Sequence, residues 1–486
     1  MPTFFIEQFG CRATQADGAA LERQLLQRGY SPASRQEADI VVINTCTVTA
    51  AADAQARDAI RRISAHNNSA KLVVTGCYAQ RAPEELATLP GVAWVVGNSH
   101  KPELPAIIEN LSVLTSAKNF IPAEALRASS TSLSEYPAKI LTGAFELKPL
   151  LSAPLFGGEG NHTRPTLKIQ DGCNSRCSYC VIPFVRGKSR SLPLTAVVQQ
   201  INQLTASGIQ EIVLSGINLG TYGKDLGPRT SFGDLLRCIL HQTSVQRLRI
   251  SSIEPMDVTH DLIDFFATND RMAQHFHMPL QSGSDRILAA MHRWYRAEHY
   301  ERRVHLIREL LPHAAIGADV IAGFPGETEE EHASTLAFIE SLPFTYLHVF
   351  SYSSRPGTAA AKLTGHLPPA VIKDRARKLR ALGEKKTSAF RRQHIGRELR
   401  ILTLRSGNDE TAQEKGPQIT HGHDVDACTR QKPALDYTPG LSSNYLRVKV
   451  RGAWPPNQWL KVRALGTEDA SVLVEPTQAY LESAVS

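Results

Sequence analysis

The 486-residue chain has no apolar run of about 18 residues, so the sequence predicts no membrane-spanning helix. It also lacks a basic segment ahead of an apolar stretch at its start, and no secretory signal is expected. Cysteine is scarce, with eight residues in all. Eight cysteines spread over such a length predict no disulfide framework and favour metal binding in a reducing cytoplasm. We therefore expect a soluble cytoplasmic protein.

One segment accounts for the net charge of +7. Residues 371–400 contain eleven basic and three acidic residues, a net charge of +8. Ile372, Ala376, Leu379 and Leu382 recur there at helical spacing, which predicts a helix with one packed face and one cationic face. Such a face is usually only solvated, so it does not by itself establish a polyanionic partner.

The first hundred residues alternate short apolar runs with helical patterns, which predicts a Rossmann-like parallel sheet with flanking helices. The strand-like runs are 3–7, 40–44, 72–75 and 92–96. Cys11, Cys46 and Cys77 each follow one of the first three runs. Because the carboxyl ends of parallel strands share one edge, these cysteines are expected to meet in space, with buried structural cysteines as the alternative.

A second alternating series follows residues rich in Ser and Gly, which predict a linker with a strand pair near 138–147. Its strand patterns are 166–170, 211–215, 247–251, 275–280, 318–322 and 346–350. Six β/α units predict an open partial barrel, short of the eight that close a full one. The tail instead has short strand patterns and turns, which predict a small β-barrel. In it, Arg447, Lys449 and Arg451 alternate with aliphatic residues and should form a basic face.

Three further cysteines, Cys173, Cys177 and Cys180, lie within eight residues at the mouth of the predicted partial barrel. Three thiolates can hold three irons of a cubane cluster and leave the fourth iron open. A structural zinc site needs four ligands, so a zinc knuckle with a distant fourth ligand is the weaker alternative. Cys238 lies in a helical pattern and is expected in the core, whereas Cys428 is assigned no role.

The run Cys173-x-x-x-Cys177-x-x-Cys180 resembles the signature of the radical S-adenosylmethionine (SAM) enzymes. The words Phe-Gly-Cys11, Asn-Thr-Cys46-Thr-Val-Thr and Val-Thr-Gly-Cys77-Tyr-Ala-Gln resemble the methylthiotransferase branch of that superfamily. The resemblance covers nearly the whole chain. It implies an N-terminal methylthiotransferase domain (1–115), a linker (116–160), a radical SAM core (161–395) and an RNA-binding β-barrel of the TRAM type (396–486). The stretch 11–15 departs from the family, which more often has Lys or Gln and an Asn there.

The resemblance implies two 4Fe–4S clusters. The cluster on Cys173, Cys177 and Cys180 would bind SAM and generate a 5′-deoxyadenosyl radical, and an auxiliary cluster on Cys11, Cys46 and Cys77 would carry the sulfur. Tyr179 matches a position that contacts the SAM adenine, although packing of its loop explains it equally well. Arg293 and Arg355 are candidates to bind a carboxylate or phosphate, or are ordinary surface arginines. The other residues expected at the SAM site, where turn chemistry is the alternative, are Gly216, Asn218, Glu254, Gln281, Ser282 and Gly323.

Residues 44–53, 74–80 and 249–255 resemble the branch that adds methylthio to C2 of N6-threonylcarbamoyladenosine at tRNA position 37. The alternatives are isopentenyladenosine 37 of tRNA, a ribosomal-protein aspartate, and a non-catalytic iron–sulfur RNA-binding regulator. The last would leave two separate three-cysteine sets unexplained. The expected partners are the tRNA anticodon loop and a cellular one-electron reductant, and we expect a monomer. The expected RNA contacts are Arg391, Arg392, Arg447, Lys449 and Arg451.

Overall fold

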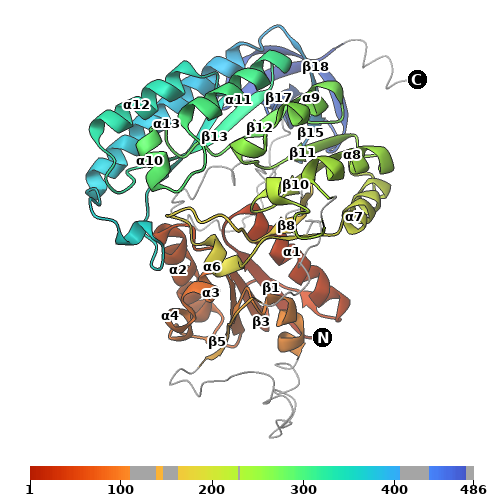
Figure 1. Cartoon of the computed structure of the whole chain (residues 1–486). Helices are drawn as coiled ribbons and strands as arrows, with labels where there is room; N and C mark the ends of the chain where they lie inside the picture. Colours follow the sequence, from red (N-terminus) through yellow and green to blue (C-terminus); the bar gives the residue numbers. More distant parts are fainter. Residues whose placement is uncertain (110–137, 146–162, 228–229, 406–436, 478–486) are drawn as a thin grey trace, which may run out of the picture.

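The computed structural model describes residues 1–109, 138–145, 163–227, 230–405 and 437–477. Its N-terminal unit is a parallel six-stranded sheet, in the order β2-β1-β3-β4-β5-β6 (Figure 1). The strands are β1 (Thr3–Gln8), β2 (Ser31–Pro32), β3 (Ile40–Thr45), β4 (Lys71–Gly76), β5 (Val92–Gly97) and β6 (Lys139–Leu141). The four predicted strands are therefore present, and the Rossmann-like sheet is confirmed.

Helices cover both faces of this sheet because its strands are apolar on both sides. Ile40 and Val42 pack with Leu21 and Leu25 of α1, whereas Val41 and its neighbours on the other face pack against α2, α3 and α4. These helices are α1 (Arg12–Gln27), α2 (Ala50–His66), α3 (Cys77–Arg81) and α4 (Pro83–Ala87). The alternation of strand and helix thus brings the carboxyl ends of β1, β3 and β4 to one edge.

The strand pair expected near 138–147 is not a hairpin of its own in the described part of that segment. Its one described strand, β6, pairs in parallel with β5, Trp94 opposite Lys139, and extends the N-terminal sheet. A parallel partner must come from elsewhere in the chain, so local sequence patterns carry no sign of it. Residues 146 and 147 lie outside the described residues.

The central unit of the chain, called the core below, holds the six predicted parallel strands. They form two three-stranded sheets, β11-β10-β7 and β12-β13-β14. A bridge between Leu248 and Met272 joins them, so that the strands form an open curved sheet. The strands are β7 (Thr166–Lys168), β10 (Glu211–Ser215), β11 (Arg247–Ile250), β12 (His275–His277), β13 (Ala315–Ala322) and β14 (Tyr346–Ser351). An additional pair, β8 (Gln170–Asp171) with β9 (Arg190–Ser191), brackets the cysteine loop.

Most helices of the core lie on its outer side, whereas the short helix at 182–186 packs against Cys77 of the N-terminal unit (Figure 1). The helices of the core are α6 (Ile182–Arg186), α7 (Leu194–Ala206), α8 (Phe232–Gln242), α9 (His260–Thr268), α10 (Asp285–Ala290), α11 (Ala297–Leu310), α12 (Glu329–Ser341) and α13 (Pro369–Arg392). Cys238 of α8 packs against the main hydrophobic cluster, as predicted. Within the described residues no helix is both long and apolar enough to cross a membrane.

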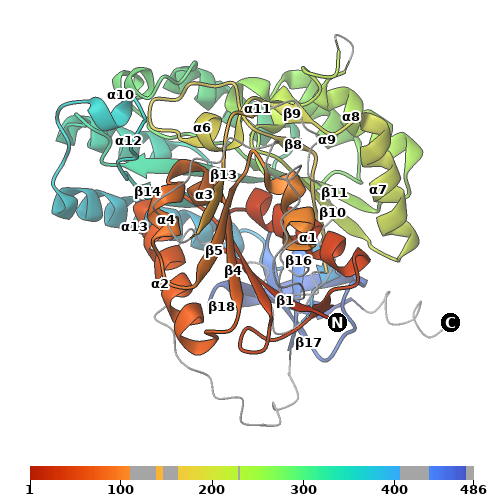
Figure 2. The same ribbon diagram turned by 90° about the horizontal axis from the view of Figure 1, so that it is seen from below.

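The C-terminal unit is a closed barrel in the order β15-β16-β17-β19-β18, which confirms the predicted small β-barrel. Its strands are β15 (Glu398–Thr403), β16 (Tyr437–Ser442), β17 (Arg447–Arg451), β18 (Trp459–Glu468) and β19 (Ser471–Pro476). Val448 and Val450 are buried inside it, so the basic residues of β17 point outward as expected. Figure 2 shows the N-terminal sheet lying across the core, with this barrel beside it.

Candidate active site

The three N-terminal cysteines lie at one edge of their sheet. Cys11 follows β1 and begins α1, Cys46 directly follows β3, and Cys77 follows β4 and starts α3. Cys46 and Cys77 are buried and Cys11 is exposed. Burial, and after it the charges of the neighbouring Cys11 and Cys77, raise the pKa of the Cys46 thiol to about 12. The three thiols therefore lie near one another at this edge, where the strand ends were expected to bring them. That they hold a metal cluster stays a prediction.

Gly10 is what allows Cys46 to approach Cys11. Its backbone has a φ of +99°, and a Cβ at this position would lie 2.7 Å from Cys46 Sγ. A side chain here would be strained by the backbone and would overlap the sulfur. The glycine of the Phe-Gly-Cys word therefore makes room for the thiol cluster.

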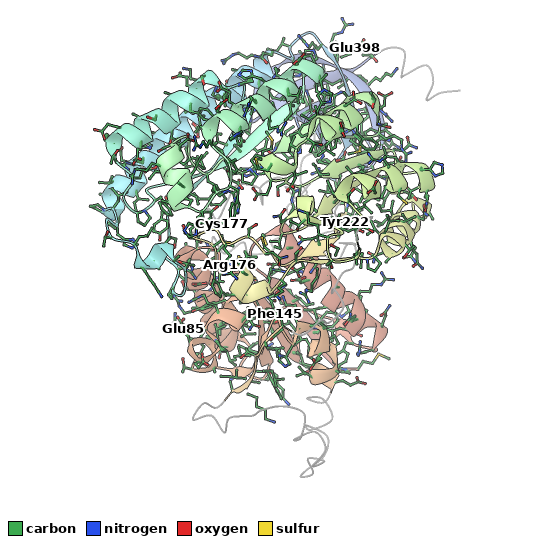
Figure 3. All side chains as sticks on the ribbon, in the orientation of Figure 1. Glu85, Phe145, Arg176, Cys177, Tyr222 and Glu398 are labelled. Carbon is green, nitrogen blue, oxygen red and sulfur yellow. The ribbon has the colours of Figure 1, made fainter. Side chains whose placement is uncertain are left out.

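The second set, Cys173, Cys177 and Cys180, occupies the loop that follows β8 at the mouth of the core. Burial, together with the charges of Cys177 and Cys173, raises the pKa of the Cys180 thiol to about 12. Figure 3 places Cys177 between the N-terminal unit and the core. At Gly172, φ is +73° and a Cβ would lie 2.1 Å from Lys188 O, so the loop can enter this turn only with glycine.

The sulfurs of both sets accept hydrogen bonds. The Ser175 N–H donates to Cys173 Sγ at 3.3 Å, and Arg293 Nη1 donates to Cys177 Sγ at 3.4 Å. In the N-terminal set, Asn98 Nδ2 donates to Cys77 Sγ at 3.4 Å. Three thiols with N–H donors, and no fourth cysteine beside them in the described residues, fit a 4Fe–4S cluster with one open iron.

One predicted SAM-site residue, Asn218, is tied directly to the cysteine loop, and Gly216 lies close to it in the chain. Asn218 Nδ2 lies 4.0 Å from Cys173 Sγ, and its buried Oδ1 has no hydrogen-bond partner among the described residues. Gln170 Oε1 accepts the N–H groups of Ile217 and Asn218, next to Gly216, while its Nε2 donates to Gly172 O. An unpaired buried amide oxygen at the cluster loop suits a polar ligand such as SAM.

The remaining predicted SAM residues surround the same mouth. Arg293 binds Glu254 as well as Cys177, so it is neither a free anion site nor a surface arginine. Tyr179 packs with Ile287, Met291 and Phe324. Gln281 has a φ of +66°, and Ser282 is fully buried against Thr335. Gly323 donates its N–H to Glu327 and a Cβ there would meet Ile372. Contact of these residues with SAM stays a prediction.

A buried ionic network joins the two cysteine sets. Arg186 donates to Asp171 Oδ1 at 2.9 Å and to Asp17 Oδ2 at 3.1 Å. Lys168 and Lys101 also bind Asp17, the latter at 3.1 Å. Burial alone would raise the pKa of Asp17, but Lys101, Lys168 and Arg186 hold it below its usual range. Asp17 and Lys101 belong to the N-terminal unit and the others to the core, so this network fixes one unit against the other.

Arg355 is bound by side chains of the protein itself. It is buried, and it binds Asp53 of α2 and donates to Thr47 Oγ1 at 2.7 Å, one residue after Cys46. Arg81 donates to the same two side chains, at 2.9 Å to Asp53 Oδ2 and 2.8 Å to Thr47 Oγ1. Arg355 therefore ties the core to the auxiliary cysteine loop, and because it is buried it is not an ordinary surface arginine. Binding of a ligand carboxylate or phosphate by Arg355 stays a prediction.

A groove of about 800 Å³ runs along β14, the edge strand of the core. It begins at Thr49 and Ala51 of the N-terminal unit and ends at Tyr445 and Arg447 of the C-terminal barrel, so all three units line it. Arg380 and Arg391 of α13 lie along its wall.

The predicted RNA contacts divide into two groups. Arg391 and Arg447 line the groove, and burial together with the charge of Arg447 lowers the pKa of Arg391. Lys449 is held by Glu468 and Asp469 at 2.9 and 3.0 Å. Arg392 and Arg451 are exposed. Of the cationic helix face predicted for 371–400, Arg375 is instead buried and bound to Glu327 and Glu329.

The sequence patterns missed several residues that build the site, because their partners are far away in the chain. Asp17 looked like one polar residue of a helix, yet its partners Lys101 and Lys168 lie 84 and 151 residues away. Gln170 and Asp171 directly precede the cysteine motif in the sequence, and this position could have identified them as site residues. The polar residues His277, Asp319 and His348 of the core strands were also missed.

Family models agree with this architecture. Residues 3–97 match the family described as "Uncharacterized protein family UPF0004", and residues 167–339 match the radical SAM superfamily. The second match implies a 4Fe–4S cluster and SAM. Among solved structures, a radical S-adenosylmethionine methyltransferase, TsrM, from Kitasatospora setae aligns with a TM-score of 0.50 at 17% identity, covering 74% of this chain and 77% of that one. This likeness concerns the fold alone.

Curated relatives span nearly the same length. A threonylcarbamoyladenosine tRNA methylthiotransferase MtaB from Aquifex aeolicus is 39% identical, over 82% of this chain and 92% of its own. The protein of the same name from Bacillus subtilis is 35% identical over 96% and 98%. A tRNA-2-methylthio-N(6)-dimethylallyladenosine synthase from Thermobifida fusca is 34% identical over 82% and 77%. The chain belongs to the radical SAM methylthiotransferase family of tRNA-modifying enzymes.

Proposed function

We propose that this protein transfers a methylthio group to C2 of N6-threonylcarbamoyladenosine at position 37 of tRNA. The observation that carries the proposal is the proximity of the two cysteine sets. Cys77 packs in one buried cluster with Val181 and Val185, and Val181 directly follows Cys180. Two centres so close can act on one substrate atom, as sulfur transfer to an unactivated carbon requires.

Each set would hold one 4Fe–4S cluster, with Cys173, Cys177 and Cys180 on the SAM-binding side and Cys11, Cys46 and Cys77 on the auxiliary side. When bound, these groups supply radical cleavage of one SAM and a sulfur that a second SAM methylates. The residues of the chain orient and shield this chemistry. Arg293 donates to Cys177 Sγ and binds Glu254. The ionic network around Asp17 holds the two cysteine-bearing regions in fixed positions relative to each other.

The tRNA substrate is supported by the relatives' names and by the groove. The groove leads from Thr49, three residues after Cys46, to the C-terminal barrel, and Arg380, Arg391 and Arg447 line it. Guanidinium groups along a channel bind phosphates, and tyrosines such as Tyr445 can stack on unpaired bases. The proposal includes a cellular one-electron reductant and action as a monomer. The cytoplasmic location stays a prediction.

The test is an anaerobic assay with tRNA that carries N6-threonylcarbamoyladenosine, followed by nucleoside mass spectrometry. We expect the 2-methylthio product, and about eight irons per chain after reconstitution. Matched tRNA that carries N6-dimethylallyladenosine should react far more slowly. An unchanged threonylcarbamoyl nucleoside would contradict the proposal.

Cysteine variants separate the two centres. Cys173→Ala should abolish formation of 5′-deoxyadenosine, because the SAM-binding cluster would be lost. Cys46→Ala should retain SAM cleavage and lose methylthio transfer. Cys238→Ala is the matched control, since Cys238 packs in the core away from both sets, and it should retain both activities. Loss of SAM cleavage in Cys46→Ala would contradict the assignment of separate roles.

A further inference from the structure

Three polar side chains meet on neighbouring strands of the core, outside both cysteine sets. His277 of β12, Asp319 of β13 and His348 of β14 bring one ligand atom each within 4.8 Å of the others. Asp319 Oδ1 lies 2.9 Å from His277 Nε2 and 3.3 Å from His348 Nδ1. Tyr346 extends the chain, with its hydroxyl 2.9 Å from His277 Nδ1 and 2.8 Å from His275 Nε2.

The positions of the protons in this hydrogen-bonded group follow from the atoms that can only accept. An ionised carboxylate only accepts, so His277 Nε2 and His348 Nδ1 must both donate to Asp319. The pKa of the Asp319 carboxyl, whose side chain is 24% exposed, lies below its usual range because of His277 and then His348, so Asp319 is ionised. In the neutral ring of His277, Nδ1 then accepts from the Tyr346 hydroxyl.

The Nε2 nitrogen of His348 has no partner within this hydrogen-bonded group. His348 lines the groove midway along β14, with its side chain 28% exposed, and the described residues offer its Nε2 no hydrogen-bond partner. Asp319 fixes the ring through the other nitrogen, as a carboxylate fixes a histidine that must present one nitrogen to a ligand. In its doubly protonated form this ring donates from Nδ1 to Asp319 and from Nε2 to an anion in the groove.

We propose that His348, positioned by Asp319, binds the carboxylate of the substrate's threonylcarbamoyl arm and selects against adenosines with an apolar N6 arm. This rests on the proposed function and names its specificity-determining residue. A dimethylallyl arm has no group to pair with the imidazole nitrogen. A site built around a polar contact rejects a substrate that lacks it far more strongly than an apolar pocket rejects an extra group.

A divalent cation is the other ligand that two imidazoles and a carboxylate could hold. In the proton arrangement derived above, which contains no metal, the two nitrogens nearest Asp319 both donate to that carboxylate. A metal would have to displace both protons and the carboxylate contacts. The experiment below includes metal binding as an outcome.

The experiment compares two anticodon stem-loop RNAs, one with the threonylcarbamoyl carboxylate free and one with it converted to the amide. The reconstituted wild-type enzyme should prefer the acid. His348→Phe keeps the aromatic shape and removes both nitrogens, and it should lower kcat/KM for the acid roughly 10- to 100-fold. It should change kcat/KM for the amide little, and leave SAM cleavage and iron content unchanged.

Two further variants make the result specific. His348→Gln, which keeps a neutral donor, should fall between wild type and His348→Phe. His305→Phe changes an exposed histidine of α11 and should match wild type. Equal loss on the acid and amide RNAs, or no loss on either, would overturn the proposal, as would one equivalent of a non-iron metal that His348→Phe removes. Failure of the wild type on the acid RNA would instead refute the proposed function.

Discussion

Glu211→Gln tests how the C-terminal barrel is held on the core. Glu211 is fully buried in β10, and its carboxylate accepts from Arg249 Nε at 2.8 Å, Arg247 Nη1 at 3.3 Å and Arg164 Nη1 at 3.4 Å. Arg247 and Arg249 in turn donate to carbonyl oxygens of the barrel, those of Arg400, Leu441, Ser442 and Ser443. One carboxylate therefore orients the guanidinium groups on which the barrel rests.

The pKa of Glu211 gives the magnitude. Burial alone would raise it, but the three arginines lower it from 4.5 to about 2. That difference corresponds to about 3 kcal/mol. Because the folded pKa lies below the unfolded one, this stabilisation is fully present above about pH 4.5 and is lost as the pH falls toward 2. Removing one partner of a buried ion pair costs about 3–5 kcal/mol, which agrees.

Hydrogen exchange at neutral pH, read by mass spectrometry, measures this effect. Peptides that cover β11 and β16 report detachment of the barrel, because Arg247 and Arg249 of β11 bind the end of β16. A loss of about 3 kcal/mol should increase the open fraction, and thus the exchange rate of protected amides there, roughly 100-fold. The amide of Gln keeps the shape of the side chain, so the change isolates the charge.

Glu468→Gln is the matched control. Glu468 also pairs with a cation of the barrel, Lys449 at 2.9 Å, but both side chains are partly exposed. Exposed pairs contribute less than about 1 kcal/mol, so exchange in this variant should change less than about fivefold. If Glu211→Gln changed exchange no more than this control does, the three arginines would not hold the barrel through Glu211.

Two other predictions concern the auxiliary loop. Gly10→Ala should halve the iron content and spare SAM cleavage, because a Cβ there would lie 2.7 Å from Cys46 Sγ, while Gly29→Ala, also at positive φ but with nothing within 4 Å, should keep its iron; equal iron loss in both would assign the effect to backbone strain. Arg355→Leu should lower the free energy of unfolding in urea by about 3–5 kcal/mol, because it leaves Asp53 buried beside fewer cations. Arg377→Leu removes an exposed pair with Asp374 and should cost less than about 1 kcal/mol.

The sequence predicts the sheets well because strand signals are local. Apolar runs set β1, β3 and β4, and the rule that parallel strands end at one edge correctly brings Cys11, Cys46 and Cys77 together. Pairings between distant segments leave no such signal. β6 joins the N-terminal sheet through β5, and Arg355 meets Asp53 from 302 residues away. A charged residue in a helix or loop looks solvated until its buried partner is known.

One further signal was available in the core strands. The N-terminal strands are apolar on both faces because helices cover both, as Val41 and Val42 show. In the core, Leu248 and Phe276 pack into the hydrophobic cluster, whereas their neighbours Arg249 and His275 do not. Polar residues at alternate strand positions therefore mark the face that the helices leave uncovered. That face carries His277, Asp319 and His348. On the proposal above, an N6 substituent with a carboxylate can bind there, whereas an apolar N6 substituent cannot.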